Sequence, residues 1–299
     1  MGSDRRRHGL ALSSEVATPR PAATVVIARG DDSWEALFLK RHHKSGFMAN
    51  AYVFPGGRVD GSDASDGNLS RIQGLDLELL CAQMEGVETA SEAASYVIAV
   101  VRETFEEAGI LLARDRAGAW VDLSDALTAE RFSRWRDRLN AGETSFEALL
   151  EEEDLCVAGE GLHYFDHWVT PAQEPRRYDA RFFVVSAPPR QRGHHDGRET
   201  TESLWQTPRQ ALDAHTRGEL MLPPPTWRVL MDLAQWTRRS EMLEAFAVDP
   251  GVVRTEPRMI DHQGTFALAL PGDPEHSSAQ ARRFGARRIV LSDGCWVEY

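Results

Sequence analysis

The sequence predicts an α/β protein, because strand patterns and a long helical pattern alternate along it. Residues 23–29 form a β-branched run, and residues 35–40 form a second strand pattern after a turn of glycine, aspartate and serine, which predicts a hairpin. Residues 91–108 repeat apolar side chains at helical spacing. Strand patterns return at residues 162–169 and 177–186.

The predicted helix at residues 91–108 has an apolar face. Ala94, Ile98, Val101 and Phe105 recur at spacings of four, three and four residues. This period places them in one stripe, and such a stripe packs against a core.

A second face of the same helix carries three carboxylates. Glu103, Glu106 and Glu107 are related as i, i+3 and i+4, so they repel one another at a cost of about a few tenths of a kcal/mol per pair. One interpretation is a solvated acidic face. The other is a divalent cation site, because hard metal ions prefer clustered oxygen ligands.

The residues around this acidic face resemble a known signature. Phe54-Pro55-Gly56-Gly57 and the stretch from Arg102 to Ile110 resemble the two halves of the Nudix box, Gly-x5-Glu-x7-Arg-Glu-U-x-Glu-Glu-x-Gly-U, where U is aliphatic. Thr104 stands at an aliphatic position, Asp63 replaces the first glutamate, and the spacer from Asp63 to Arg102 is about thirty residues too long. The chain is identified on these residues as a member of the Nudix hydrolase family.

A box split by an insertion resembles the branch that contains the mammalian peroxisomal coenzyme A diphosphatase. Further segments resemble that branch, and the resemblance runs from about residue 24 to the end of the chain. These segments are Gly46-Phe47-Met48 with Val53-Phe54-Pro55-Gly56-Gly57, Arg177-Tyr178-Asp179 with Phe182-Phe183, and Leu222-Pro223-Pro224-Pro225.

The resemblance implies an α/β/α sandwich around a mixed sheet, with insertions. We expect a disordered tail at residues 1–20 and a Nudix domain at 21–240, with insertions at 61–90 and 123–160. Residues 241–299 are predicted to be a small β-rich extension packed on that domain.

Local patterns predict further elements. One helix is expected around residues 69–84, and two helices within 123–153 are expected to begin after the N-caps Ser124 and Thr144. A helix with proline in its first turn starts at Pro208, and another spans residues 226–238. Short strands are expected around residues 266–270, 288–291 and 296–299.

Composition limits the possible partners and compartment. The hydrophobic fraction of 42% and the charged fraction of 27% are those of a globular protein. A net charge of −12 argues against nucleic acid, and no apolar run is long enough for a membrane. Cys81, Cys156 and Cys295 form no paired motif, which favours a reducing compartment. We expect a cytoplasmic protein, and the resemblance leaves homodimer formation open, since many relatives pair.

The resemblance implies a Mg²⁺ or Mn²⁺ site. Its ligands would be Glu106 and Glu107, a carbonyl of the glycine pair at Gly57, and Glu103, which alternatively takes the proton of the attacking water. Arg102 is expected to hold a neighbouring carboxylate by two parallel hydrogen bonds, and is counted with the catalytic residues.

Other candidates lie in loops. Glu202 or Glu199 is expected to supply an additional catalytic glutamate. The sequence leaves the role of Asp63 open between metal binding and backbone hydrogen bonds. Arg41 and Lys44 belong to a basic loop that is either a solvated turn or a contact for substrate phosphates.

Phe54 and Arg177, which belong to the resembling segments, are also expected to bind substrate. The predicted reaction is metal-dependent hydrolysis of the diphosphate of coenzyme A or an acyl-coenzyme A, which gives adenosine 3′,5′-bisphosphate and a 4′-phosphopantetheine product. The alternatives are a diphosphatase for NADH or ADP-ribose and a non-catalytic module that senses a nucleotide.

Overall fold

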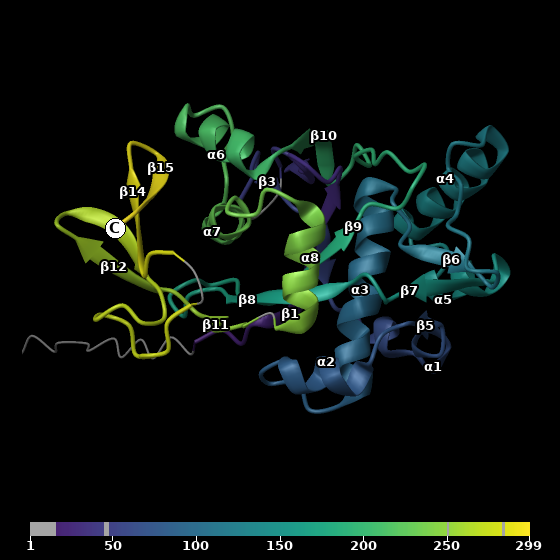
Figure 1. Cartoon of the computed structure of the whole chain (residues 1–299), viewed down its shortest axis with the longest axis horizontal. Helices are drawn as coiled ribbons and strands as arrows, with labels where there is room; N and C mark the ends of the chain where they lie inside the picture. The colour runs from purple at the N-terminus through teal and green to yellow at the C-terminus, as the bar shows by residue number, and fades with distance from the viewer. Residues whose placement is uncertain (1–15, 45–47, 250, 283–284) are drawn as a thin grey trace, which may run out of the picture.

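The computed structural model describes residues 16–44, 48–249, 251–282 and 285–299. Its largest sheet has eight strands (Figure 1). The strand order is β10 (Thr200–Gln206), β2 (Glu35–Arg41), β1 (Arg20–Arg29), β9 (Tyr178–Ser186), β8 (His163–Val169) and β11 (Arg254–Thr255). Short strands β3 (Tyr52–Val53) and β4 (Gly56–Arg58) pair with β2 and β1. β1 runs parallel to β9 and β11 parallel to β8, so the sheet is mixed.

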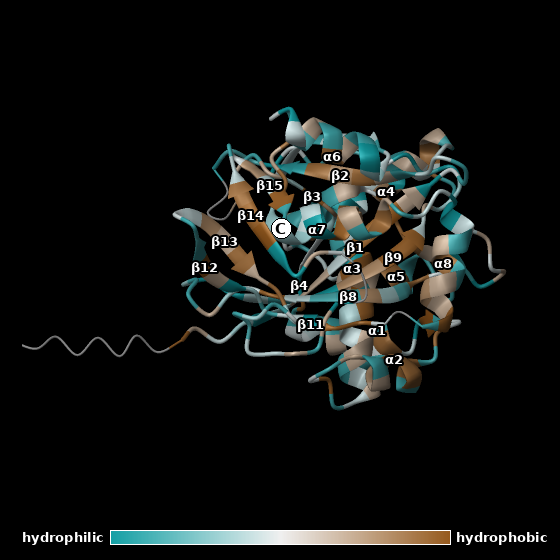
Figure 2. Cartoon of the chain, turned by 60° about the vertical axis from the view of Figure 1, so that its left-hand side comes forward, coloured by the Kyte–Doolittle hydropathy of each residue, from teal (hydrophilic) through white to brown (hydrophobic). Residues whose placement is uncertain are grey.

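The predicted hairpin is confirmed, since β1 and β2 pair antiparallel with Ala28 opposite Ala36. Strand β1 is buried on both faces, because Val25 and Ile27 enter one hydrophobic core and Val26 enters the other. Hydrophobic colour accordingly follows the central strands in Figure 2.

Helices cover both faces of this sheet. One core contains side chains of α2 (Leu77–Gln83), α3 (Ala90–Ala108), α4 (Ala126–Asn140) and α5 (Phe146–Glu152). The other contains side chains of α6 (Pro208–Thr216), α7 (Pro224–Leu233) and α8 (Arg239–Val248). The structure confirms the predicted α/β/α sandwich.

Helix α3 matches the helix predicted at residues 91–108. The hydroxyl of Thr89 accepts a hydrogen bond from the Glu92 amide at 3.1 Å and caps its start. Gly109, with a φ of 66°, ends it in the left-handed conformation that glycine adopts without strain. The predicted apolar stripe is fully buried, which fixes the direction in which the acidic face points.

The prediction of a single helix around residues 69–84 is wrong. The whole insertion instead forms a 3₁₀ turn η1 (Gly61–Ala64), α1 (Asp66–Leu69), β5 (Ile72–Gln73) and α2. β5 joins β7 (Leu155–Ala158) and β6 (Ala113–Asp115) in a separate sheet. Gly74 breaks the helix, because its φ is +70° and a Cβ there would lie 2.8 Å from that of Glu160.

The two helices predicted within residues 123–153 are present as α4 and α5. Their N-caps are Asp125 and Ser145, one residue beyond the predicted Ser124 and Thr144. This difference is within the usual uncertainty of helix ends.

The C-terminal part differs more from prediction. The helix expected to reach residue 238 ends at Leu233, and α8 was not predicted. A four-stranded sheet then follows, with β12 (Arg258–His262), β13 (Thr265–Ala269), β14 (Arg288–Ser292) and β15 (Cys295–Glu298). Three of these strands match the predicted ones, and β12 is additional.

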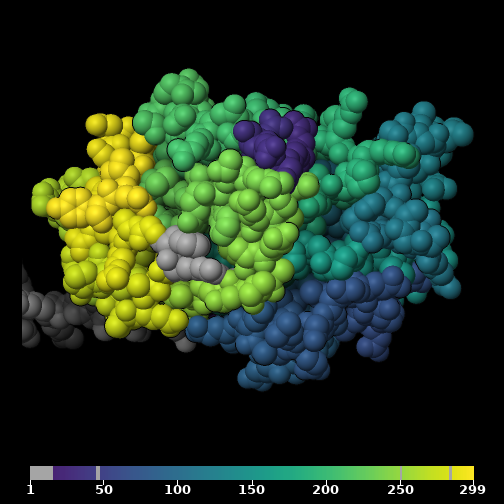
Figure 3. Space-filling model, viewed as in Figure 1, coloured from purple at the N-terminus to yellow at the C-terminus, as the bar shows by residue number. Residues whose placement is uncertain are grey.

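The C-terminal residues, yellow in Figure 3, pack against the rest of the chain. Arg282 forms a buried link, because its guanidinium donates to Asp166 at 2.7 Å and to Asp232 at 2.9 Å. The predicted boundary at residue 240 stays a prediction. The predicted tail is too long, since Arg20 already belongs to β1, and residues 1–15 lie outside the described chain. No helix among the described residues has the length and hydrophobicity needed to cross a membrane.

Candidate active site

The acidic face of α3 lies against the Pro-Gly-Gly segment. The amide of Gly56 donates a hydrogen bond to Glu107 at 3.0 Å. Gly57 pairs with Ala23 of β1, and a Cβ added to it would lie 2.3 Å from the carboxyl carbon of Glu103. The structure thus brings together the two halves of the motif that the insertion separates in sequence.

Arg102 connects several of these groups. Its Nη1 donates to Glu103 at 2.9 Å and to Glu106 at 3.2 Å, while Nη2 donates to the carbonyl of Arg58 at 3.0 Å. Its Nε and Nη2 also bind the two carboxylate oxygens of Asp63 at 2.8 and 3.0 Å. Asp63 therefore faces Arg102, and it also accepts the backbone amide of Asp60 at 2.8 Å, as one of the two alternatives from the sequence expects.

Burial disfavours the charged forms of the three glutamates. It raises the pKa of Glu103 to about 7, with Arg102 opposing the shift and the charge of Glu106 adding to it. Burial likewise raises the pKa of Glu106. The pKa of Glu107 is raised well above its usual value by burial and by the charge of Glu103, although the Gly56 amide counteracts this.

These carboxylates fit a divalent cation in chemistry, although they do not form a finished cage. Within the described residues, no three acidic, histidine or cysteine side chains converge as a ready metal site. The reason is that Arg102 holds Glu103 and Glu106, while Glu107 turns to Gly56. The three glutamates nevertheless supply hard oxygen donors within about one helical turn, and their negative charges outnumber the nearby positive charge of Arg102. Mg²⁺ prefers donors of this kind.

The structure distinguishes the two candidate loop glutamates. The charge of Glu199 contributes to the raised pKa of both Glu103 and Glu107, so its carboxylate lies within electrostatic range of the cluster. Glu202 lies in β10, where it accepts a hydrogen bond from the Tyr52 hydroxyl at 2.9 Å and pairs with Lys40 at 3.4 Å. These contacts place Glu199, rather than Glu202, within electrostatic range of the cluster, and the catalytic role of either residue stays a prediction.

Basic residues lie at the end of strand β2 and just after it. The charge of Arg41 favours the ionised form of Glu107 and lowers its pKa, so Arg41 borders the cluster. Its Nε is buried and has no hydrogen-bond partner among the described residues. Lys44 is exposed and comes just before residues 45–47, which the structure does not describe.

Two predicted substrate contacts have other surroundings. Phe54 is 2% exposed and packs its ring against Phe38, with 5.2 Å between centroids. Arg177 is also buried, and its guanidinium binds the carbonyls of Thr170 and Ala17 and the carboxylate of Glu256. These positions give both residues structural roles and do not support the predicted contacts with substrate.

Sequence reasoning missed two side chains of α4 at this site. Arg136 donates to the carbonyl of Glu106 at 2.9 Å, and Asn140 donates to the same oxygen at 3.3 Å. The only signal for them in the sequence is their spacing. Two polar residues four positions apart lie on one face of the helix, next to its apolar residues.

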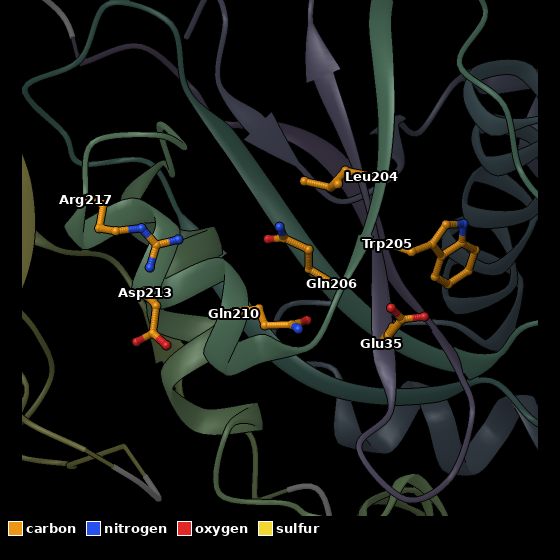
Figure 4. A pocket seen from close by; sticks show the side chains of 7 residues that line it. All are labelled: Glu35, Leu204, Trp205, Gln206, Gln210, Asp213 and Arg217. Carbon is orange, nitrogen blue, oxygen red and sulfur yellow. The ribbon is translucent and has the colours of Figure 1, made fainter.

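A hollow of about 420 Å³ lies between β10 and α6 (Figure 4). None of the predicted site residues lines it. Its lining consists of Glu35, Leu204, Trp205, Gln206, Gln210, Asp213 and Arg217.

Comparisons with known proteins agree with this fold. Residues 80–233 match the NUDT19 Nudix domain. Acyl-coenzyme A diphosphatase NUDT19 of Xenopus laevis is 30% identical over 270 residues, which cover 80% of this chain and 70% of that protein. The Gallus gallus protein of the same name is 28% identical over 331 residues, covering 93% and 85%.

A solved structure supports the same grouping. The crystal structure of a NUDIX hydrolase from Alicyclobacillus acidocaldarius is 28% identical and superposes with a TM-score of 0.62, covering 77% of this chain and 97% of that one. The predicted family is therefore confirmed: the chain belongs to the NUDT19 Nudix domain family and is a Nudix hydrolase.

Proposed function

We propose that this hydrolase cleaves the diphosphate linkage of coenzyme A or an acyl-coenzyme A. The products would be adenosine 3′,5′-bisphosphate and 4′-phosphopantetheine or its acylated form. The observation that carries the proposal is the cluster of Glu103, Glu106 and Glu107, three desolvated carboxylates held within one helical turn. The printed names of the Xenopus laevis and Gallus gallus relatives support the substrate class.

The proposed cofactor is Mg²⁺ or Mn²⁺. Glu103, Glu106, Glu107 and the backbone carbonyl of Gly57 would hold it. When bound, such an ion polarises a phosphoryl oxygen and lowers the pKa of a coordinated water. Arg102 restricts the rotamers of Glu103 and Glu106 through its hydrogen bonds, and the carboxylate of Glu103 lies against Gly57.

Glu199 is the proposed acceptor for the proton of the attacking water. Its position near Glu103 and Glu107 supports this role, whereas the carboxylate of Glu202 is engaged by Tyr52 and Lys40. Glu103 is the second candidate, because its carboxylate lies against Gly57 within the same cluster.

Arg41 is proposed to contact the substrate phosphates, with Lys44 further along the same segment. The buried and unpartnered Nε of Arg41 supports this, since a buried donor without a partner is costly unless a ligand satisfies it. A guanidinium suits a phosphate because it presents parallel donors.

The test compares coenzyme A, acetyl-coenzyme A, NADH and ADP-ribose at equal concentration, with Mg²⁺, Mn²⁺ or a chelator, by chromatography of the products. We expect metal-dependent cleavage that prefers the two coenzyme A compounds. Preference for NADH or ADP-ribose would support diphosphate hydrolysis but refute coenzyme A as the substrate class. Absence of turnover for all four would refute the proposal and favour the nucleotide-sensing alternative.

Cytoplasmic location and homodimer formation stay predictions. The three cysteines are free, which supports a reducing compartment.

A further inference from the structure

Helix α4 of the second insertion contacts the C-terminal end of α3, the helix that carries the three glutamates. The last carbonyls of a helix have no partner within the helix, and the carbonyl of Glu106 is one of them. Arg136 and Asn140 of α4 both donate to this oxygen. A cationic side chain at this end is also favourable to the helix dipole.

The same arginine reaches a second segment. Its Nη2 donates to the carbonyl of His194 at 2.9 Å, and the amide of His194 donates to the carbonyl of Ala108 at 2.7 Å. The guanidinium lies close to Gly109, where a Cβ would be 3.0 Å from Nη1. Arg136 thus joins the end of α3 to the start of the loop that leads to β10.

This loop is held by hydrogen bonds of its own. Asp196 accepts hydrogen bonds from the amides of Arg198, Glu199 and Thr200 at 3.1, 3.0 and 2.9 Å. These bonds connect the segment that begins at His194 to Glu199, whose charge acts on Glu103 and Glu107.

We propose that Arg136 is a positioning residue for the hydrolytic reaction. By joining Glu106 to His194, it sets where Glu199 stands relative to the glutamates of α3. The helical insertion then acts on the reaction without touching substrate. The proposal rests on the proposed function in that Glu199 takes part in the chemistry.

The contacts of Arg136 suit such a role better than simple packing. The residue is partly buried, and none of the ion pairs formed within the described residues includes it. Its fork-shaped guanidinium instead binds one carbonyl from each of the two segments, which a lysine cannot reproduce.

The first test is Arg136→Met, with Arg138→Met as the matched control on the same helix. Arg138 stacks over Trp135 at 4.8 Å and makes none of the contacts described above. We expect Arg136→Met to lower kcat by about tenfold to a hundredfold at saturating metal, with KM nearly unchanged, because small misplacements of reacting groups have such effects. The control should retain kcat. If Arg136→Met does not fold, Arg136→Lys replaces it, with the same expectation in direction.

The second test separates positioning from general stability. In a Glu199→Gln background, Arg136→Met should cause little further loss, because the two changes affect one group. Losses that multiply would overturn the proposal, as would an unchanged kcat in the single variant.

A third readout does not depend on activity. Hydrogen exchange at the amides of residues 194–200 should become faster in Arg136→Met, while the buried middle of α3 stays protected. Unchanged exchange in this loop would overturn the proposal even if the protein hydrolyses none of the tested diphosphates. Absence of turnover in the unmodified protein would instead count against the proposed function.

Discussion

Both carboxylate oxygens of Asp63 accept hydrogen bonds from the guanidinium of Arg102, at 2.8 and 3.0 Å, although 39 residues separate the two. Asp63 is only 1% exposed and also accepts from the amide of Asp60 at 2.8 Å. The pair joins the two halves of the split motif. The inserted helices α1 and α2 can therefore extend the chain between them without disturbing the acidic face.

Asp63→Ala should destabilise the fold. It leaves a largely buried guanidinium with only part of its partners, and breaking a buried pair typically costs about 3–5 kcal/mol. Because Glu103 and Glu106 remain bound to Arg102, we expect about 2–4 kcal/mol less unfolding free energy in denaturant titrations. Asp66→Ala, in the same insertion, is the control and should cost less than about 1 kcal/mol. Equal effects would contradict the role of the pair.

Glu107→Gln should separate stability from activity. The amide oxygen of glutamine still accepts from Gly56, while one buried negative charge is removed, so the metal-free melting temperature should be unchanged or higher. Turnover should fall by about a hundredfold or more, since a proposed metal ligand is lost. Calorimetry with and without Mg²⁺ provides the measurement. The unmodified protein should gain stability from the ion, and the variant should gain little. Loss of folding in the variant would instead assign Glu107 a structural role.

Glu199→Gln and Glu202→Gln form a matched pair. A residue that accepts the proton of the attacking water typically contributes about 10²–10⁴-fold to the rate. We expect a loss of that size for Glu199→Gln in kcat, and a change of less than about threefold for Glu202→Gln. Steady-state kinetics at saturating metal decide between the two candidates, and the opposite ranking would assign the proton acceptor to Glu202.

The sequence predicted the central helix well because its signals are local. The predicted apolar stripe depends only on residues close together in the chain, and so do the cap at Thr89 and the ending at Gly109 that the structure adds. The choice between Glu199 and Glu202 depends on a β-bulge, since the pairing of β10 with β2 shifts between Thr200 and Glu202. A bulge changes which face a side chain occupies, and this cannot be read from alternation alone.

The broken helix in the first insertion has a similar explanation. Residues 69–84 have enough helical pattern locally, but β5 gains hydrogen bonds by pairing with Val157 and Ala158 of β7, far along the chain. Tertiary pairing overrides local preference there. Arg136 was missed for the same reason, because its partners at Glu106 and His194 are distant in sequence.

Stability should fall in mild acid because of two histidines, of which His167 is fully buried and His163 is partly buried. Burial lowers the pKa of His163 and of His167 from the usual 6.5. The unfolded chain then binds protons more readily than the folded protein below that pH. The stability due to the neutral imidazoles is complete above about pH 6.5 and is lost as the pH falls towards the lowered values, by at most about 1.4 kcal/mol per pH unit for each histidine.

Denaturant titrations at pH 7.5 and 5.5 test this, with His163→Gln as the comparison. Other groups titrate over the same range, so the difference between the two proteins carries the information. The variant should lose less stability than the unmodified protein on acidification. An equal loss would show that His163 is protonated as easily in the folded state as in the unfolded one.

The neighbouring glycines should respond differently to alanine. A Cβ at Gly56 would lie 2.3 Å from the carbonyl oxygen of Ala23, which belongs to the backbone of β1 and cannot move freely, and the φ of +148° adds strain. Gly56→Ala should therefore cost about 1–3 kcal/mol of unfolding free energy. At Gly57 the obstacle is the carboxyl end of the Glu103 side chain, which can shift at the cost of its hydrogen bond from Arg102. Gly57→Ala should keep nearly all stability and lower kcat by about tenfold or more, because the displaced carboxylate leaves its position in the cluster. If both variants lost stability equally while Gly57→Ala kept full activity, the position of Glu103 against Gly57 would have no part in the reaction.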